Sequence, residues 1–222
     1  MRGPAFDYED VVAFLASRGI DDADLRFGSI LEGHLDFIRA TMSRQLRPRR
    51  RPLIGLHIGN FVGVSLAAFA DSLRSIDARS TVVAIDPNVT VAGIDNPQEH
   101  VIAALERYNL LDCVLLLTGY SFEPTELSGA PPVDRFPASG VETLPQLARL
   151  GVKFDTALID GNHRGTTVQR ELEWLRPRMR RRGIVFLDDV TDAWPEIRDV
   201  FGSARSYRRI GHDGRIGALR PS

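Results

Sequence analysis

The chain has 222 residues, of which 43% are hydrophobic and 26% are charged, and its formal net charge is −1. These values fit one globular α/β domain with a buried core. The longest apolar runs are far shorter than the roughly 20 residues that a membrane span requires, which excludes a transmembrane helix. A nearly neutral chain also has no strong overall field with which to collect nucleic acid or anionic membrane.

Two further features concern the cellular setting. Residues 1–9 lack the basic start and apolar run of a secretory signal, so we expect a cytoplasmic protein with no membrane partner. The single cysteine, Cys113, excludes an intramolecular disulfide and is expected to be a packed core thiol. The sequence leaves open whether the chain forms a homo-oligomer.

The chain begins with two segments of helical periodicity, residues 7–18 and 30–46. We expect them to form an N-terminal helical cap, residues 1–52, ahead of a second unit that spans residues 53–222. In this second unit, short apolar runs alternate with helix-period segments, which is typical of a parallel sheet covered by helices. The predicted strands are residues 53–58, 81–86, 113–118, 154–160 and 183–188, and the predicted helices are 64–74, 96–108, 141–150, 166–180 and 193–201.

The C-terminal part differs from this alternation. Residues 206–210 and 215–219 are short β-prone runs around an Asp213-Gly214 turn, which predicts an antiparallel hairpin. We therefore predict an α/β fold: a Rossmann-like, doubly wound, mostly parallel seven-stranded sheet that ends in this hairpin. The aperiodic segment 122–139 is longer than an ordinary connection and is either a binding loop or a surface insert.

Polar residues follow each predicted strand, at the sheet edge where doubly wound proteins bind ligands. Gly59, Asn60, Gly63 and Ser65 follow the first strand. The glycines permit a tight turn and a close approach of a ligand to the next helix N-terminus, although glycines also simply terminate strands. Phe61 stands where the dinucleotide fingerprint needs its second glycine, which argues against a nicotinamide enzyme.

The second predicted strand ends in Asp86, followed by Pro87. An acidic residue at this position suits hydrogen bonds to both hydroxyls of an adenosyl ribose. The alternative is an aspartate that only stabilises a turn.

The five strand ends together resemble a known family. In chain order they carry the motif Ile58-Gly59-x-x-x-Gly63-x-Ser65, Asp86, Gly119-Tyr120-Ser121, Asp160 and Asp188-Asp189. This order is similar to that of the class I S-adenosylmethionine-dependent methyltransferases. Within the class, residues 53–190 resemble the metal-dependent O-methyltransferases related to catechol O-methyltransferase and the macrolide sugar O-methyltransferases.

The resemblance implies a role for each matching position. Gly59, Gly63 and Ser65 would hold the methionine part of S-adenosylmethionine, and Asp86 would bind its ribose. Gly119, Tyr120 and Ser121 would flank its adenine. The implied cofactor-binding set also includes Asn60, Pro87 and Asp160.

The resemblance also implies a metal site, with Asp160, Asp188 and Asp189 as ligands. Three carboxylates at adjacent strand ends repel one another unless a hard cation, Mg²⁺ or Mn²⁺, neutralises them. For Asp188 and Asp189 alone, the alternative is a strand-end turn that caps the next helix.

The segment Asp160-Gly161-Asn162-His163 resembles the macrolide sugar enzymes, in which a histidine three residues beyond the metal-binding aspartate can take the acceptor proton. This likeness implies catalytic roles for His163 and Asp160. A histidine with a pKa near neutrality suits such a role, but His163 could instead cap a helix or pack beside the cofactor. One departure concerns His57, because the family usually has an acidic residue two positions before the first loop glycine.

We therefore expect metal-assisted O-methylation of a small-molecule hydroxyl on a sugar, polyol or phenol. Two alternatives stay open. The first is a nucleic-acid methyltransferase that contacts phosphates through the arginines of residues 44–51, although we do not expect a nucleic-acid partner. The second is a non-catalytic module that keeps the cofactor-binding fold.

Overall fold

The structure is a computed structural model that describes residues 4–122 and 141–222. The segment 122–139, expected to be either a binding loop or a surface insert, therefore lies outside the described residues, apart from Phe122. The strands are β1 Ile54–Ile58, β2 Thr81–Asp86, β3 Val114–Thr118, β4 Phe154–Ile159, β5 Met179–Leu187, β6 Tyr207–His212 and β7 Gly217–Pro221. The α-helices are α1 Tyr8–Ser17, α2 Asp22–Gly28, α3 Glu32–Gln45, α4 Val64–Ile76, α5 Pro97–Arg107, α6 Thr143–Ala148, α7 Gly165–Leu175 and α8 Pro195–Ser203, and the short 3₁₀ helices are η1 Leu111–Cys113 and η3 Arg176–Arg178.

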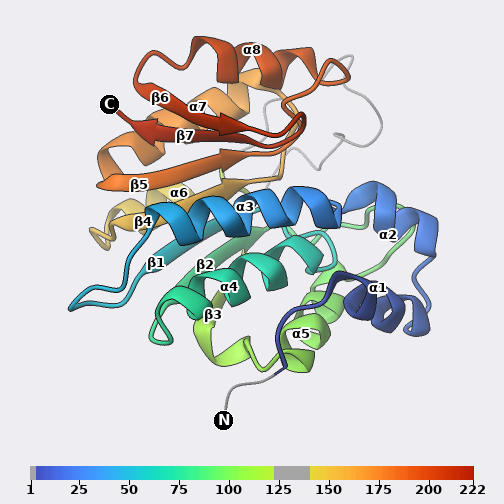
Figure 1. The fold of residues 1–222 in the computed structure, drawn as a ribbon. Helices are drawn as coiled ribbons and strands as arrows, with labels where there is room; N and C mark the ends of the chain where they lie inside the picture. Colours follow the sequence, from blue (N-terminus) through green and yellow to red (C-terminus); the bar gives the residue numbers. More distant parts are fainter. Residues whose placement is uncertain (1–3, 123–140) are drawn as a thin grey trace.

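The strands form one seven-stranded sheet in the order β3-β2-β1-β4-β5-β7-β6 (Figure 1). β1 to β5 pair in parallel, and β7 lies antiparallel between β5 and β6. The chain runs outward from β1 to β3 and then returns to place β4 on the other side of β1. The point between β1 and β4 is therefore the topological switch point, where doubly wound sheets bind their ligands. The predicted fold class is confirmed.

Helices cover both faces of the sheet (Figure 1). Ala84, Leu158 and Phe186 are buried in a core layer with α1, α3, α4 and α5. Leu56 and Val185 belong to the opposite layer, which contains buried residues of α6, α7 and α8. Because successive side chains of a strand point to opposite faces, near-continuous apolar strands supply both layers.

The N-terminal helices pack against the body of the sheet. α3 lies along one sheet face beside α4 and also contacts β5, while α1 contacts α4 and α5 (Figure 1). α2 was not predicted, because a seven-residue helix with Leu25 as its buried residue shows no clear period. Its start is stabilised by the Asp21 side chain, which accepts a hydrogen bond from the backbone N–H of Ala23 at 2.8 Å.

The predicted boundary between the last crossover helix and the fifth strand was wrong. The helix expected to reach residue 180 ends at Leu175, and β5 begins at Met179 rather than at Gly183. Pro177 provides no backbone N–H and so cannot continue an α-helix. Met179 is buried and pairs with Phe154 of β4. At the opposite end of this strand pair, β4 ends at Ile159, so Asp160 lies one residue beyond its strand.

Within the described ranges, no helix has the length and apolar character needed to cross a membrane.

Candidate functional site

The loop after β1 depends on two glycines. Gly59 has φ +86°, and a Cβ on it would lie 2.1 Å from the carbonyl oxygen of Asp160. Gly63 has φ +99° and precedes the first turn of α4, and a Cβ there would lie 2.9 Å from the Cα of Val101. Only glycine adopts this backbone without strain and allows these close approaches. The end of β1 therefore lies directly against the end of β4.

Asp86 ends β2 beside this loop, as predicted. Its Oδ2 accepts a hydrogen bond from the backbone N–H of Asn60, and its Oδ1 accepts one from the backbone N–H of Asn88, both at 2.7 Å. Burial raises the pKa of the Asp86 carboxyl, and these backbone hydrogen bonds offset part of that rise. The carboxylate is thus held in one orientation at the mouth of a pocket, whose lining is Asn60, Phe61, Asp86, Gln98, Val101, Leu116 and Leu117.

His57 stands where the family usually has an acidic residue, and it is fully buried in β1. Its Nδ1 lies 3.1 Å from Oδ1 of Asn60, so its contact is with the loop side chain. Burial lowers the pKa of His57 to about 3, which keeps the imidazole neutral. The histidine therefore helps to fix Asn60, whose backbone N–H in turn holds Asp86.

The segment after β3 reaches the same pocket edge. The backbone N–H of Gly119 donates to the carbonyl oxygen of Asp86 at 2.9 Å. Burial raises the pKa of the Tyr120 hydroxyl, and the negative charge of Asp86 raises it further. Ser121 is buried and its hydroxyl interacts with Glu171 of α7 instead. Pro87 is half-buried next to Asp86.

The structure gathers the three predicted metal ligands at the ends of β4 and β5. Asp160 is half-buried, and loss of solvation together with the negative charge of Asp188 raises its pKa well above the usual range for an aspartate. The Ser65 hydroxyl, predicted to contact the cofactor, donates to Oδ2 of Asp160 at 3.0 Å. Ser65 therefore links the first turn of α4 to this acidic group.

Arg215, which sequence reasoning missed, occupies the centre of the acidic group. Its Nε and Nη2 donate to both carboxylate oxygens of Asp188 at 2.7 and 2.6 Å, and its Nε lies 3.3 Å from Oδ1 of Asp189. In residues 4–122 and 141–222, no group of three or more His, Cys, Asp or Glu side chains is arranged to hold a metal ion. Because a guanidinium already engages two of the three predicted ligands, this donor set does not fit a divalent metal.

His163 lies beside the same group. Its Nε2 is 2.8 Å from Oδ2 of Asp189, and its ring stacks on that of Trp194 with centroids 4.0 Å apart. The two contacts fix both the position and the plane of the imidazole. A second pocket opens here, lined by Ile159, Asp160, Gly161, Asn162, His163, Val168, Leu187, Asp188, Asp189 and Ile197.

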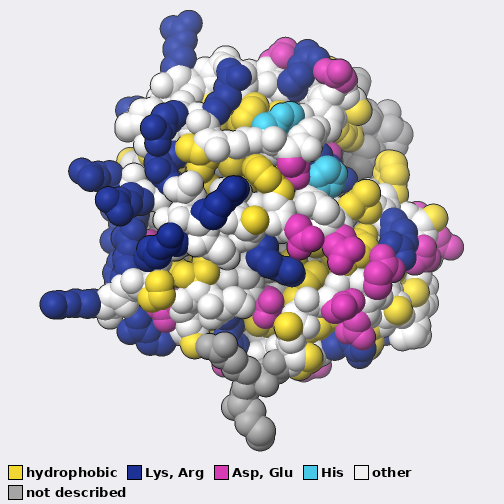
Figure 2. Space-filling model, viewed as in Figure 1, with side chains coloured by type: hydrophobic (Ala, Val, Ile, Leu, Met, Phe, Trp, Pro, Cys, Tyr) yellow, Lys and Arg dark blue, Asp and Glu magenta, His cyan; other side chains and the backbone are white. Residues whose placement is uncertain are grey.

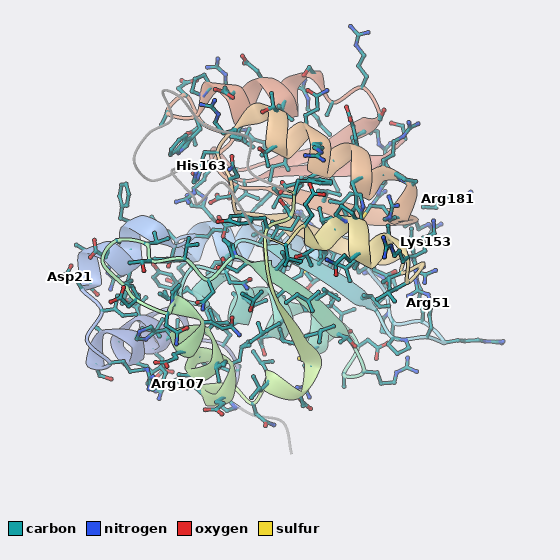
Figure 3. The ribbon with its side chains drawn as sticks, turned by 180° about the vertical axis from the view of Figure 1, so that it is seen from behind. Asp21, Arg51, Arg107, Lys153, His163 and Arg181 are labelled. Atoms are coloured by element: carbon teal, nitrogen blue, oxygen red, sulfur yellow. The ribbon has the colours of Figure 1, made fainter. Side chains whose placement is uncertain are left out.

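The basic clusters lie at the other end of the strands. Arg51 precedes β1 and donates to both oxygens of the buried Asp155 of β4, and Arg180 of β5 lies 3.8 Å from the same carboxylate. Lys and Arg side chains gather on this side in Figure 2, and Figure 3 shows Arg51, Lys153 and Arg181 at the edge opposite His163. The arginine-rich surface is therefore remote from both pockets.

These observations bear on the family of the chain. A family model described as a methyltransferase domain matches residues 56–190. The chain belongs to this methyltransferase family. The matched range includes every predicted site residue, and the resemblance to methyltransferases is confirmed. A sequence comparison with curated proteins gives no match.

Solved structures of methyltransferases have the same fold. The methyltransferase PaMTH1 of Podospora anserina, in complex with SAH, is 15% identical with a TM-score of 0.66, over 99% of this chain and 89% of that chain. The O-methyltransferase of Bacillus cereus, also in complex with SAH, is 16% identical with a TM-score of 0.63, over 96% and 90%. CalS11, a TDP-rhamnose 3'-O-methyltransferase of calicheamicin biosynthesis, is 18% identical with a TM-score of 0.57, over 96% and 92%.

Proposed function

We propose that this methyltransferase uses S-adenosylmethionine to methylate a hydroxyl group of a small molecule such as a sugar, a polyol or a phenol. The observation that carries the proposal is the pair of pockets on either side of the Gly59 loop. One contains the clamped carboxylate of Asp86, and the other contains the imidazole of His163. The SAH in the structures of the Podospora anserina and Bacillus cereus enzymes supports the choice of cofactor.

The pocket at Asp86 suits an adenosyl group. Its carboxylate can accept from both ribose hydroxyls, because each carboxylate oxygen has a further lone pair beyond the one used by a backbone N–H. Val101, Leu116 and Leu117 offer apolar surface for a flat base. The N-terminus of α4 begins at the Gly63 turn and presents unpaired backbone N–H groups that favour a carboxylate such as that of the methionine part.

The second pocket would then hold the acceptor. When bound, S-adenosylmethionine supplies an electrophilic methyl group, whose carbon–sulfur bond breaks as the acceptor oxygen bonds to carbon. The proton of the acceptor hydroxyl goes to His163, whose tautomer is fixed by the contact between its Nε2 and Asp189. Stacking on Trp194 keeps the ring in place, and such positioning supplies much of the rate in a displacement reaction.

The two alternatives receive less support. Arg49 and Arg51 lie near Asp155, and Figure 3 shows Arg51 at the edge opposite His163, so these arginines are poorly placed to guide a polynucleotide to the reaction site. A non-catalytic module would not need an imidazole held by two separate contacts. His57, the main reason to consider such a module, has a structural explanation in its contact with Asn60.

A transfer assay with labelled methyl donor tests the proposal. The purified chain is incubated with S-adenosylmethionine and a panel of sugar nucleotides, free polyols, phenols and RNA. We expect label in a hydroxyl-bearing small molecule and none in RNA. Label only in RNA would contradict the proposal, and cofactor binding without transfer to any acceptor would favour the non-catalytic module.

A further inference from the structure

The guanidinium of Arg215 lies where a cation bridging two of the strand-end carboxylates would lie. It makes a two-point contact with Asp188 at 2.6 and 2.7 Å and reaches Asp189 at 3.3 Å. The Asp188 side chain is 3% exposed and that of Arg215 is 21% exposed, so water screens this pair poorly. The remaining oxygen of Asp189 accepts from His163. All four oxygens of these two carboxylates are therefore occupied.

The backbone of Arg215 is held as firmly as its side chain. Its N–H donates to Oδ1 of Asp213 at 2.9 Å, and its carbonyl oxygen accepts from the N–H of Val190 at 2.8 Å. The Asp213 carboxylate also lies 2.9 Å from Nδ1 of His34 in α3. The β6–β7 hairpin is thus attached both to α3 and to the residue that follows Asp188 and Asp189.

The positive charge of Arg215 compensates the negative charge of the carboxylates at this sheet edge. The two carboxylates that Arg215 contacts, Asp188 and Asp189, are stabilised by a compensating cation, and an arginine remains protonated at every physiological pH. A divalent ion at the same carboxylates would have to displace a two-point ion pair and leave a guanidinium partly buried without its partner, which is costly.

We propose that Arg215 is the resident cation of this site and that methyl transfer by this chain does not require a divalent metal ion. The guanidinium fixes the carboxylate of Asp189, which in turn fixes His163. It also provides a permanent positive charge near the position at which an acceptor oxygen becomes negative. The role in catalysis rests on the proposed function, whereas the occupation of the cation position does not.

Binding of Mn²⁺, followed by electron paramagnetic resonance and by the melting temperature, tests this inference without any acceptor. The proteins compared are the wild type, Arg215→Gln and the control Arg208→Gln, which removes an exposed arginine of β6. We expect no stoichiometric Mn²⁺ binding by the wild type or the control. Arg215→Gln should melt at a lower temperature, bind Mn²⁺ at least about tenfold more tightly, and recover stability when Mn²⁺ is added.

Several results would overturn the inference. One Mn²⁺ bound per wild-type chain would show that Arg215 yields its place to a metal. Absence of Mn²⁺ binding by both proteins would show that the carboxylates form no cation site at all. If Arg215→Gln does not fold, Arg215→Lys is tested instead, because it keeps the charge. We expect this variant to fold and not to bind Mn²⁺. Metal binding by Arg215→Lys would contradict the assignment. In the transfer assay, loss of wild-type activity in excess chelator would contradict metal independence, even though the proposed methyl transfer itself would stand.

Discussion

His163 is held by a carboxylate on one side and by an indole face on the other. If it takes the acceptor proton, His163→Ala should lower turnover by about 10²–10⁴-fold, the usual contribution of a general base, with nearly unchanged affinity for S-adenosylhomocysteine. Single-turnover transfer and calorimetry measure the two quantities separately. A variant that loses thermal stability but keeps its turnover per folded molecule would show that the imidazole only packs.

Glu171 is a fully buried carboxylic acid in α7, and burial raises its pKa to about 7 from the ordinary glutamate value of 4.5. Since the folded state holds this proton more tightly than the unfolded chain, the stabilising contribution is complete below pH 4.5 and is lost as the pH rises through about 7. Glu171→Gln removes this dependence. The free energy of unfolding of Glu171→Gln, relative to that of the wild type, should therefore be higher near pH 8 than at about pH 5. The expected increase is on the order of 3 kcal/mol.

Urea denaturation of the wild type, Glu171→Gln and Glu173→Gln at both pH values measures this gain. Glu173 is exposed on the same helix, so its variant should follow the wild type at each pH. A constant difference between Glu171→Gln and the wild type across this range would mean that Glu171 is not buried in the way described.

Some site residues could be predicted from the sequence and others could not. Asp86 and Asp160 stand at the ends of apolar runs and His163 lies three residues beyond Asp160, so the sheet topology alone brings them to one edge. Arg215 and Trp194 reach that edge only because the β6–β7 hairpin and the start of α8 fold back against β5. No local pattern distinguishes Arg215 from the many other arginines of the chain.

Among the helices and strands, the contact between the ends of β1 and β4 allows a prediction about stability. Gly59→Ala would place a Cβ 2.1 Å from a backbone oxygen of Asp160, in a left-handed conformation that costs about 1–2 kcal/mol for other residues. We expect the free energy of unfolding to fall by about 2–4 kcal/mol, because both strand ends must move.

Gly33→Ala in α3 is the matched control. A Cβ on Gly33 meets nothing within 4 Å, and alanine is favoured over glycine inside a helix by about 0.5–1 kcal/mol, so this variant should be more stable than the wild type. Denaturant titration of both variants measures the two signs. Equal stability of Gly59→Ala and the wild type would contradict the described packing of the two strand ends.

A helix or strand was predicted accurately where residues close to it in the sequence determine its bounds. Both ends of β2 were predicted correctly, because Thr81–Asp86 is a continuous, mostly apolar run that ends in a polar residue. The start of β5 was missed because three consecutive arginines separate Met179 from the apolar run that begins after Gly183. Met179 pairs with Phe154 of β4, and after a register shift Ile184 pairs with Thr156, so the start of β5 has a tertiary cause.

In the molecule as a whole, the arginine-rich surface is separate from the two pockets in which we propose that the reaction takes place. Figure 3 shows Arg51 and Arg181, near the N-terminal ends of β1 and β5, at the edge opposite His163. The two pockets lie at the C-terminal ends of the strands. Exchanging the exposed Arg50 and Arg182 for glutamate should therefore leave methyl transfer to a small acceptor within about twofold of the wild type, because screened charges act weakly over such a distance. A large loss of transfer in steady-state assays would instead favour an anionic macromolecular acceptor.

We propose that the pocket at Asp86 binds the adenosyl cofactor. Calorimetric titration with S-adenosylhomocysteine tests it most directly, on the wild type, on Asp86→Asn and on the control Asp112→Asn, which changes an exposed aspartate of η1. We predict one site per wild-type chain, an unchanged affinity for the control, and a loss of about 1–3 kcal/mol for Asp86→Asn, the range for hydrogen bonds to a charged group. No binding by the wild type, or equal affinity in Asp86→Asn, would contradict the assignment of this pocket to the cofactor.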